Sequence, residues 1–475
     1  MFTTYTYQDW AATPEWRRPE LLEKIIKSYK GSEDFTRALD ALEYFRGDNP
    51  TVAKKVILQK GRYEVKSQDE HGRVIKRYVT RDKAIEGARL PASILFRLVT
   101  QQNQFLLGNG VTLATAEEKN RLGLAFDKAL EQIGERALLG GVCWGFWNVD
   151  HLEVLEAARD RLSGFVALLD EETSAPMVGI QFWQIDLRRP LHVRLFELDG
   201  LTVYRKGKDS LEIIKPKRPY SLTVSRDVLG EMITGYNNYD VLPVIPMYAN
   251  AEKRSELTTA IKAKIDAYDR IQSDFVDNLD KANDVYWVLN NWGGTLSDMQ
   301  DMIDTVRQTG ILANQSDGVG GNSTAQPHAF EVPYQARQTA LQILEREIYK
   351  DYMAINMDEI TGGSLTNVAI KTAMLNLNLK ADRYEWQAFQ FVQKVLALLG
   401  IQTEEIRFKR QTLVNDTEIV DNISKMREYI DVETALKLNP YIEQDEIDEI
   451  IDAMDQEDTG AGIDMPQEPE EITEA

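Results

Sequence analysis

The chain has few of the residues that mark disulfide-bonded, metal-binding or membrane-spanning proteins. Its 475 residues include one cysteine, Cys143, so an intrachain disulfide and a cysteine-based metal cluster are both excluded. No run of about 18 apolar residues occurs, which argues against a transmembrane helix. Residues 1–18 also lack the basic start and apolar core of a signal peptide. These absences predict a protein kept in a reducing cytoplasm, with no membrane partner.

A strongly basic region is also missing. The formal net charge is −21, and residues 443–475 hold fourteen Asp and Glu with no Lys or Arg, which leaves −7 for the rest. Proteins that hold nucleic acid tightly neutralise its phosphates with a basic face. We therefore expect no tight, sequence-specific DNA binding, although loose passage of DNA is compatible with this charge. The acidic composition of residues 457–475 predicts a disordered tail, and docking of a basic partner by that tail stays open.

The sequence contains no convincing set of catalytic or cofactor-binding residues. No glycine-rich loop is followed by Lys-Ser or Lys-Thr, and the four histidines are scattered. Asp298, Asp301 and Asp304 have a helical spacing that could gather a divalent ion, but such a row is more often a solvated helix face. Cys143 lies in an apolar strand, where a core thiol is expected rather than a nucleophile. We expect no enzyme activity, cofactor or metal; a metal-dependent nuclease is the alternative left open.

The first 251 residues combine helical and strand patterns, which predicts an α+β arrangement within a mainly α chain. Helices are expected at about 19–26, 35–45, 91–107 and 117–138, and short strands around a turn at 69–72. Further strands are expected at 140–149, 166–169, 178–185, 193–197, 201–204 and 220–224. Turn residues separate these strands, so the pattern indicates an antiparallel β layer resting on helices.

Two long helical patterns follow and flank a compact insert. In residues 252–283 an apolar stripe recurs at steps of three and four; its members are Leu257, Ile261, Ile265, Tyr268, Ile271, Phe275, Leu279 and Ala282. Residues 334–356 carry a second stripe that includes Leu341, Leu344, Ile348 and Tyr352. Other faces of the first helix carry five aspartates: Asp266, Asp269, Asp274, Asp277 and Asp280. A stripe of this length needs a partner of similar length, so the two helices are expected to pair.

The insert and the C-terminal third have weaker patterns. Within the insert we expect strands at 285–289 and 310–313, a helix at 295–308, a flexible loop at 314–327 and an extended piece at 330–333. Glycines at 362–363 separate the second long helix from a third, which is expected to span 366–399 and to end at Gly400. Shorter helices are expected at 418–427, 432–438 and 443–454.

Four segments resemble the portal proteins of tailed bacteriophages, in particular those of phages infecting Gram-positive bacteria. Residues 94–111, ILFRLVTQQNQFLLGNGV, resemble a signature in which a helix ends in a Tyr/Phe-Leu-Leu-Gly-Asn-Pro turn. Similar matches follow in the family's order: a strand pair at 170–183, a Pro-x-x-x-Asn entry to a long helix at 246–274, and a glycine-rich loop before a helix start at 363–371. The chain departs from the pattern at Gly110, where proline is usual, and at Thr366-Asn367, where Ser-Gly is usual.

The resemblance implies a portal architecture. Its parts would be an α/β wing (1–251), stem helices (252–283 and 334–356), a small α/β clip (284–333), a tunnel loop (357–365), a long wing helix with wing return (366–427), helical crown (428–456) and tail (457–475). The DNA-facing tunnel loop would consist of Met357, Asp358, Glu359, Ile360, Thr361, Gly362, Gly363, Ser364 and Leu365. Clip contacts to terminase and adaptor would involve Trp287, Trp292, Asp298, Asp301, Ile311 and Phe330. Stripe residues of both stem helices, from Leu257 to Leu279 and from Leu341 to Tyr352, would pack against neighbouring subunits.

The same resemblance implies a function. Such proteins form a dodecameric ring at one capsid vertex, through which terminase packages double-stranded DNA and DNA is later ejected. Implied partners are other copies of this chain, the large terminase subunit, the major capsid and scaffolding proteins, and a head-completion adaptor. The ring would nucleate procapsid assembly in the host cytoplasm and stay in the virion as the head-to-tail connector. The acid-rich half of the first stem helix would repel DNA phosphates, as a conduit requires. A phage structural or scaffolding protein without a channel is the alternative.

Overall fold

The computed structural model describes residues 3–53, 56–68, 74–226, 232–282, 285–290, 324–329, 334–357, 367–411, 416–426 and 429–439, together with 447, 450 and 451. The chain divides into two compact units. The first comprises Met1–Ala354 and Lys380–Arg410, and the second Ile355–Leu379 and Gln411–Ala475. Helices and antiparallel sheets occur together, so the α+β class is confirmed. Among the described helices, none is long and apolar enough to cross a membrane.

A six-stranded antiparallel sheet forms the predicted β layer of the first unit. Its order is β11-β10-β9-β8-β7-β6, so each strand pairs with its neighbours in sequence. The strands are β6 (Ala158–Asp160), β7 (Ser163–Leu169), β8 (Pro176–Trp183), β9 (His192–Glu197), β10 (Gly200–Lys206) and β11 (Leu211–Arg218). β11 was not predicted from the sequence, because every residue after Leu211 in this edge strand is exposed and the apolar alternation is absent.

A second sheet of three strands lies between two hydrophobic cores. It consists of β14 (Val244–Tyr248), β4 (Val142–Asn148) and β5 (His151–Glu156), with β4 in the centre. Alternate residues of a strand point to opposite faces. Trp144 and Phe146 therefore enter one core, and Cys143 and Trp147 enter the other. This double burial explains why almost every residue of β4 is apolar.

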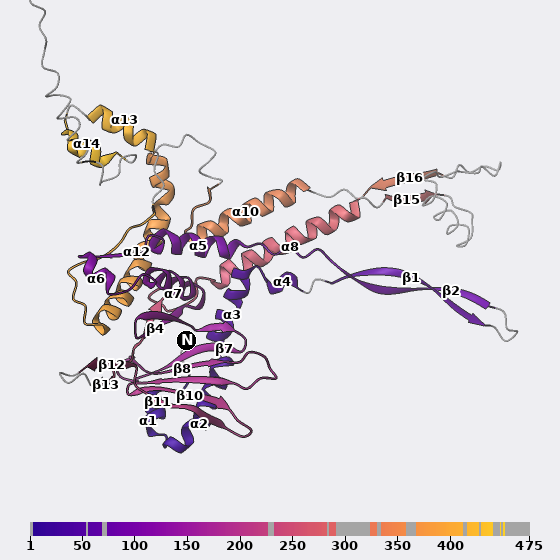
Figure 1. Cartoon of the computed structure of the whole chain (residues 1–475). Coiled ribbons are helices and arrows are strands. Elements are labelled where there is room, and N and C mark those ends of the chain that lie inside the picture. The colour runs from indigo at the N-terminus through magenta and orange to yellow at the C-terminus, as the bar shows by residue number, and fades with distance from the viewer. Residues whose placement is uncertain are drawn as a thin grey trace, which may run out of the picture. The chain divides into compact units, whose positions relative to one another are not determined.

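The first core joins the two sheets face to face. Trp144 contacts Phe165 of β7 with ring centroids 5.3 Å apart, and Phe146 contacts Phe196 of β9 at 4.9 Å. Helix α2 (Arg18–Lys30) covers the other face of the six-stranded sheet, where Tyr29 meets Phe182. The short helices α1 (Tyr7–Ala12) and η1 (Glu15–Arg17) precede it, and α1 and α2 lie beside this sheet in Figure 1.

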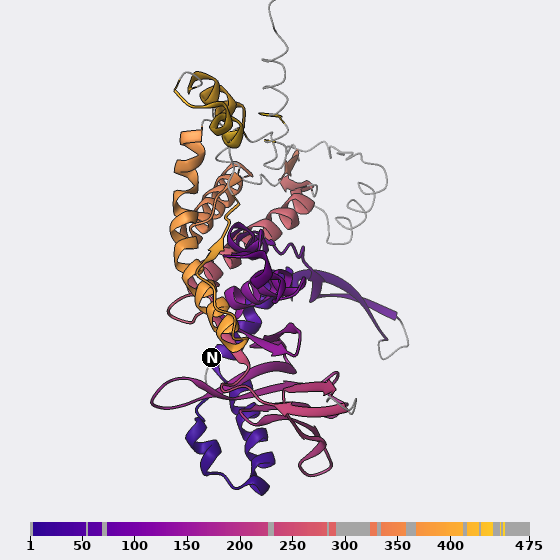
Figure 2. The same ribbon diagram turned by 60° about the vertical axis from the view of Figure 1, so that its left-hand side comes forward.

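Helices of the second core cover the remaining face of the three-stranded sheet. They are α3 (Glu33–Arg46), α5 (Ile94–Leu107), α7 (Phe126–Gly140) and the last part of α12 (Asn367–Leu398), as Figures 1 and 2 show. The helix expected at 117–138 is two helices, α6 (Ala116–Asn120) and α7, separated by turns around Gly123, whose φ is 79°. α12 ends just before Gly400, as predicted.

Four two-stranded sheets complete the list of strands. They pair β1 (Val56–Gln68) with β2 (Val74–Glu86), β3 (Val111–Leu113) with β17 (Ile406–Phe408), β12 (Ser221–Arg226) with β13 (Met232–Asn237), and β15 (Val285–Asn290) with β16 (Thr324–Ala329). The strands predicted around the 69–72 turn are confirmed and longer than expected, with Val56 opposite Glu86 and Gln68 opposite Val74.

In the insert, β15 confirms one predicted strand and β16 corrects the predicted loop. The Gly, Ser, Asn and Asp content of residues 314–327 predicts a loop, yet residues 324–327 pair with β15, and Trp287 lies opposite Pro327. Both strands of a two-stranded sheet are edge strands, where proline is tolerated. The other elements expected between 291 and 323, and the extended piece at 330–333, lie outside the described residues.

The two long helices are α8 (Thr259–Ala282) and α10 (Tyr334–Tyr352), and they pack side by side as predicted (Figure 1). α8 begins at residue 259 rather than 252. Before it, the Asn250 side chain accepts from Arg254 N at 3.1 Å and donates to Arg254 O at 2.9 Å, which holds a turn. α10 ends at residue 352 rather than 356 because Met353 has a φ of 62° and Ala354 N donates to Tyr349 O at 2.9 Å.

The second unit contains the first part of α12, α13 (Asp416–Met426) and α14 (Val432–Leu438). The helices predicted at 418–427 and 432–438 are thus confirmed. Asp431 caps α14 by accepting a hydrogen bond from Thr434 N at 3.0 Å. α12 belongs to both units, since the division falls between Leu379 and Lys380. The helix predicted over 366–399 is confirmed as α12. Its division between two units was not predicted, because helical periodicity does not indicate where a helix passes from one unit to another.

Candidate functional site at the base of the paired helices

Two buried polar residues of α5 bind the long helices at their base. Gln102 and Asn103 are each 1% exposed. The Tyr352 hydroxyl at the end of α10 donates to Gln102 Oε1 at 2.8 Å, and the Tyr384 hydroxyl of α12 donates to Asn103 Oδ1 at 2.9 Å. Asn103 Nδ2 in turn donates to Glu131 O of α7 at 2.9 Å. Buried polar groups need partners, so these bonds specify where three helices meet α5.

The protonation of the two tyrosines keeps these bonds in place. Burial raises the pKa of both Tyr352 and Tyr384 well above the usual tyrosine value. Both hydroxyls therefore remain protonated and act as donors. A Cβ at Gly134 of α7 would lie 2.3 Å from the Tyr384 hydroxyl oxygen and 2.6 Å from Asn103 Oδ1. Glycine at 134 thus lets α7 approach this cluster closely.

The turn after α5 explains a departure from the portal signature. Gly110 has a φ of 71°, which a proline cannot adopt because its ring holds φ near −65°. A Cβ at this position would also lie 2.5 Å from the Asp127 carboxyl carbon. Asp127 Oδ1 accepts from Val111 N at 3.2 Å and from Lys119 Nζ at 2.5 Å. The usual proline would therefore be incompatible with the turn that this chain forms.

A buried ion pair connects the turn before α8 with α12 and with the end of α10. Lys380 Nζ lies 2.8 Å from Glu256 Oε2, donates to Tyr352 O at 2.8 Å, and sits over the Tyr352 ring. The side chains of Lys380 and Glu256 are 12% and 15% exposed. Burial lowers the pKa of Lys380, and the nearby Glu256 carboxylate opposes that shift. The lysine also satisfies a carbonyl that the early end of α10 leaves without a helical partner.

One face of α8 carries side chains that bind an extended segment before α5. Ala88 N donates to Asp277 Oδ1 at 2.7 Å, Leu90 N to Ser273 Oγ at 3.2 Å, and Ala92 N to Asp269 Oδ1 at 2.8 Å. Four helical residues rise about 6.0 Å and two extended residues span about 6.6 Å, so the two spacings match. The segment therefore runs antiparallel to α8 and uses every second backbone N–H.

Three of the five aspartates that were predicted to repel DNA bind groups of their own chain. Asp269 is 0% exposed and also accepts from Asn49 Nδ2 at 2.5 Å. Asp266 accepts from the hydroxyls of Tyr44 and Thr51, and Asp277 binds Ala88 N. These three carboxylates face their own chain because backbone and hydroxyl donors there need acceptors. Burial raises the pKa of Asp269, which the bonds from Asn49 and Ala92 N oppose.

The predicted stripe residues divide into two groups. Ile261, Ile265, Ile348 and Tyr352 are at most 3% exposed within the single chain, and Leu257 and Tyr268 pack against the same core. Ile271, Phe275, Leu341 and Leu344 are half-buried, and Leu279 is 45% exposed. Subunit packing was predicted for all of them. The four buried residues pack within the subunit's own core together with residues of α3, α5 and α12, and subunit packing by the stripe stays a prediction.

The structure describes few of the predicted tunnel-loop and clip residues. Met357 is 48% exposed, and residues 358–365 lie outside the described part of the chain. Trp287 has a described position on β15. Trp292, Asp298, Asp301, Ile311 and Phe330 also lie outside the described residues. The DNA-facing role of the loop and the contacts of the clip therefore remain predictions.

Two observations on the described residues concern chemistry: the grouping of possible metal ligands and the surroundings of Cys143. Over these ranges no group of three or more His, Cys, Asp or Glu could hold a metal ion. Cys143 is fully buried, its S–H donates to Leu155 O at 3.5 Å, and burial raises the pKa of its thiol. A nucleophilic cysteine needs an accessible thiolate, so the prediction of a core thiol is confirmed. What the site does is hold long helices in fixed positions.

Comparison with known proteins identifies the family. Residues 26–460 match the sequence model described as "Phage portal protein, SPP1 Gp6-like", and the chain belongs to this family. It is 25% identical over 220 residues to the portal protein of Clostridium phage phiCD119, covering 45% of this chain and 48% of that protein. It is 27% identical over 221 residues to the portal protein of Bacillus phage SPP1, covering 43% and 42%. Each match thus spans about half or less of the curated relative.

Proposed function

We propose that this chain is the subunit of a ring-shaped phage portal at one capsid vertex. In this proposal double-stranded DNA is packaged through the ring by a terminase and later leaves through it. The observation that carries the proposal is the family match over residues 26–460, which includes all three long helices. The number of subunits is proposed to be twelve, as the resemblance implies.

The structure supports a role that depends on assembly. α8 and α10 are held firmly at their base, whereas Leu279 and Tyr334 near their far ends are 45% and 54% exposed. A closed ring gives each subunit two neighbours through heterologous contacts, which can cover such apolar positions. In the proposed ring these ends of the helices form part of the channel wall, with residues 284–333 as the clip and 357–365 as the tunnel loop.

The proposed partners follow from this placement. The clip would contact the large terminase subunit during packaging and the head-completion adaptor afterwards. The wing and crown would contact major capsid and scaffolding proteins during procapsid assembly in the host cytoplasm. DNA would pass without tight binding, in keeping with the net charge of −21. In the finished virion the ring would be the head-to-tail connector.

Electron microscopy of the purified protein tests the proposal. The expected result is a closed ring with a central hole, and class averages would give the subunit number. A protein that stays monomeric at micromolar concentration would contradict the proposal. The same images separate it from a scaffolding protein without a channel. A nuclease is tested by incubating the protein with DNA and Mg²⁺ in the absence of terminase, where we expect no cleavage.

A further inference from the structure

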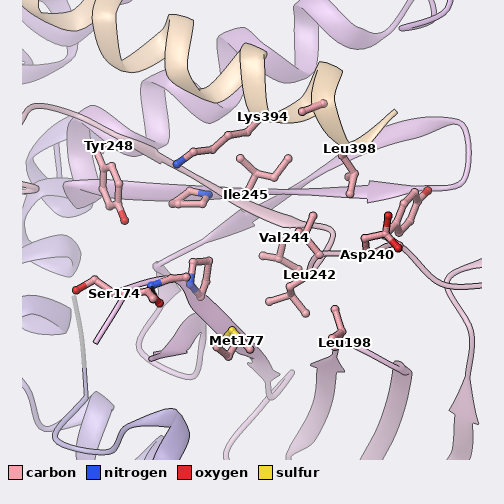
Figure 3. A pocket seen from close by; sticks show the side chains of 17 residues that line it. Ser174, Met177, Leu198, Asp240, Leu242, Val244, Ile245, Tyr248, Lys394 and Leu398 are labelled. Atoms are coloured by element: carbon pink, nitrogen blue, oxygen red, sulfur yellow. Dashed lines mark hydrogen bonds between the residues drawn. The ribbon is translucent and has the colours of Figure 1, made fainter. Parts of the chain in front are cut away.

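An apolar pocket opens in the first unit where the two sheets meet α12. Its volume is about 670 Å³, and Met177, Leu198, Val241, Leu242, Ile245 and Leu398 contribute apolar side chains to its lining. Figure 3 shows Leu398 entering from α12, and Met177 and Leu198 from strand ends on the opposite side. Leu198 and Val241 are 44% and 59% exposed, so an apolar side chain that enters the pocket would cover them. We call this the wing pocket.

The loop between β8 and β9, residues 184–191, presents apolar side chains to solvent. Ile185 and Leu187 are 83% and 79% exposed. The loop is nevertheless held in one shape, because Gln184 Nε2 donates to Leu187 O at 3.3 Å and to Arg189 O at 2.7 Å. Asp186 O accepts from Arg189 N at 2.9 Å. A loop already ordered in this way loses little entropy on binding, which favours association. We call it the wing loop.

The wing pocket and the wing loop lie at opposite ends of the same strand. The pocket includes Pro176 and Met177 at the start of β8, and the loop follows Trp183 at its end. Eight extended residues span roughly 26 Å, so a loop cannot reach the pocket of its own subunit. A contact between the loop of one copy and the pocket of the next is heterologous, the type that closes rings.

Charge favours the same pairing. The wing loop carries Arg188 and Arg189, with Asp186 as its one acidic residue. The 170–175 loop that forms one wall of the pocket begins with Asp170, Glu171 and Glu172, and the lining includes Asp240 and the basic Lys394. The loop is thus net positive and the pocket rim net negative. Complementary charge around an apolar contact increases the association rate and selects the orientation.

We propose that the wing loop of one subunit inserts Ile185 and Leu187 into the wing pocket of its neighbour. The inference rests on the proposed ring and names one of its subunit contacts. The occupant of the wing pocket is a second copy of this chain. The chain carries both the positive loop and the negative pocket rim, and the length of β8 keeps the two apart within one subunit.

Disulfide crosslinking tests this contact. The variants pair Leu187→Cys with Val241→Cys, or Leu187→Cys with Leu198→Cys, in full-length protein whose native Cys143 is buried. Under mild oxidation we expect a ladder of covalent oligomers on denaturing gels, up to the ring size. The matched control pairs Val241→Cys with Leu124→Cys, which is fully exposed in another turn, and should give no ladder.

A charge reversal gives a second, independent measurement. Arg188→Glu with Arg189→Glu should raise the protein concentration needed for ring formation by about tenfold or more, because like charges then meet. Arg159→Glu is the control, because Arg159 is exposed on β6. Equal thermal unfolding temperatures of the two variants would show that the fold is intact. If rings form normally but neither cysteine pair gives a ladder, the proposed contact is overturned and the portal proposal stands. Absence of rings in the unmodified protein would instead overturn the portal proposal.

Discussion

The base and the far ends of α8 and α10 have the same sequence pattern but different surroundings. At the base, Ile265 and Ile348 are both 0% exposed. Toward the far ends, Leu279 is 45% exposed and Leu341 is half-buried. Polar contacts differ in the same way, since Asp269 is buried with two donors whereas Asp274 is exposed. One apolar stripe thus serves the subunit's own fold at one end and leaves surface for other chains at the other.

This difference separates changes that unfold the subunit from changes that prevent assembly. Substitutions at the base should lower the free energy of unfolding, because they leave cavities or unpaired polar groups in a closed core. Substitutions at the far ends should leave unfolding almost unchanged and weaken association. Each of the following variants tests one side of the comparison.

The largest effect is expected for Ile265→Pro. An interior proline removes a helical hydrogen bond and costs about 3 kcal/mol or more, and here it also removes a fully buried side chain. Circular dichroism should show lower thermal stability, and electron microscopy no rings. Thr259→Pro is the control, because proline is tolerated in the first turn where α8 begins. Normal rings from Ile265→Pro would mean that α8 does not depend on this core.

Lys380→Met should cost about 3 kcal/mol in unfolding free energy, because it leaves Glu256 buried without its cation. The double variant with Glu256→Gln should recover part of that loss. Lys264→Met is the control: its pair with Asp351 joins α8 to α10 at 2.8 Å, but this pair is more exposed and its loss should cost about 0.5 kcal/mol. Denaturant titration measures all three. Equal losses at both lysines would contradict a special role for the buried pair.

Asp269→Ala should cost about 2 kcal/mol, because Asn49 Nδ2 and Ala92 N lose their acceptor in a buried place. Asp274→Ala on the exposed face should change stability by less than about 0.5 kcal/mol. Hydrogen exchange of the Ala92 amide should also become faster in the Asp269 variant. Unchanged exchange there would show that the 88–92 segment is held by other contacts.

Leu279→Ser combined with Tyr334→Ser should change the unfolding free energy by less than about 0.5 kcal/mol, since both side chains are exposed in the single chain. Sedimentation should nevertheless show a higher concentration threshold for ring formation than for the unmodified protein. Phe96, which is 46% exposed but on α5, provides a control position for a Phe96→Ser change. A matched loss of assembly at Phe96 would mean that the effect is not specific to the far ends.

The smallest effect is expected for deletion of residues 456–475. This stretch is rich in Asp and Glu and also contains Gly, Pro and Thr, a composition that predicts no packed structure. Rings should form as in the full chain. Failure to assemble would show that the tail takes part in the ring.

Much of the fold could be predicted from periodicity. The apolar stripes located α8 and α10, and alternating strands with turn residues located most of the six-stranded sheet. β11 escaped because an exposed edge strand has no apolar alternation, and β5 because Leu152 and Leu155 belong to different cores. The bonds from residues 88–92 to α8 had one weak signal, the four-residue spacing of Asp269, Ser273 and Asp277, which equally fits a solvated helix face.

The sequence alone determined which segments form long helices, because periodicity and terminal residues are local properties, and it also carried the family resemblance. Only the tertiary structure decided what each face of those helices contacts. The aspartates of α8 looked like a negative channel wall, yet three of them bind donors of their own chain. Gln102 and Asn103 are polar residues within an apolar helix, and their partners Tyr352 and Tyr384 lie hundreds of residues away. Long-range pairing of buried polar groups depends on the folded geometry, which no local pattern specifies.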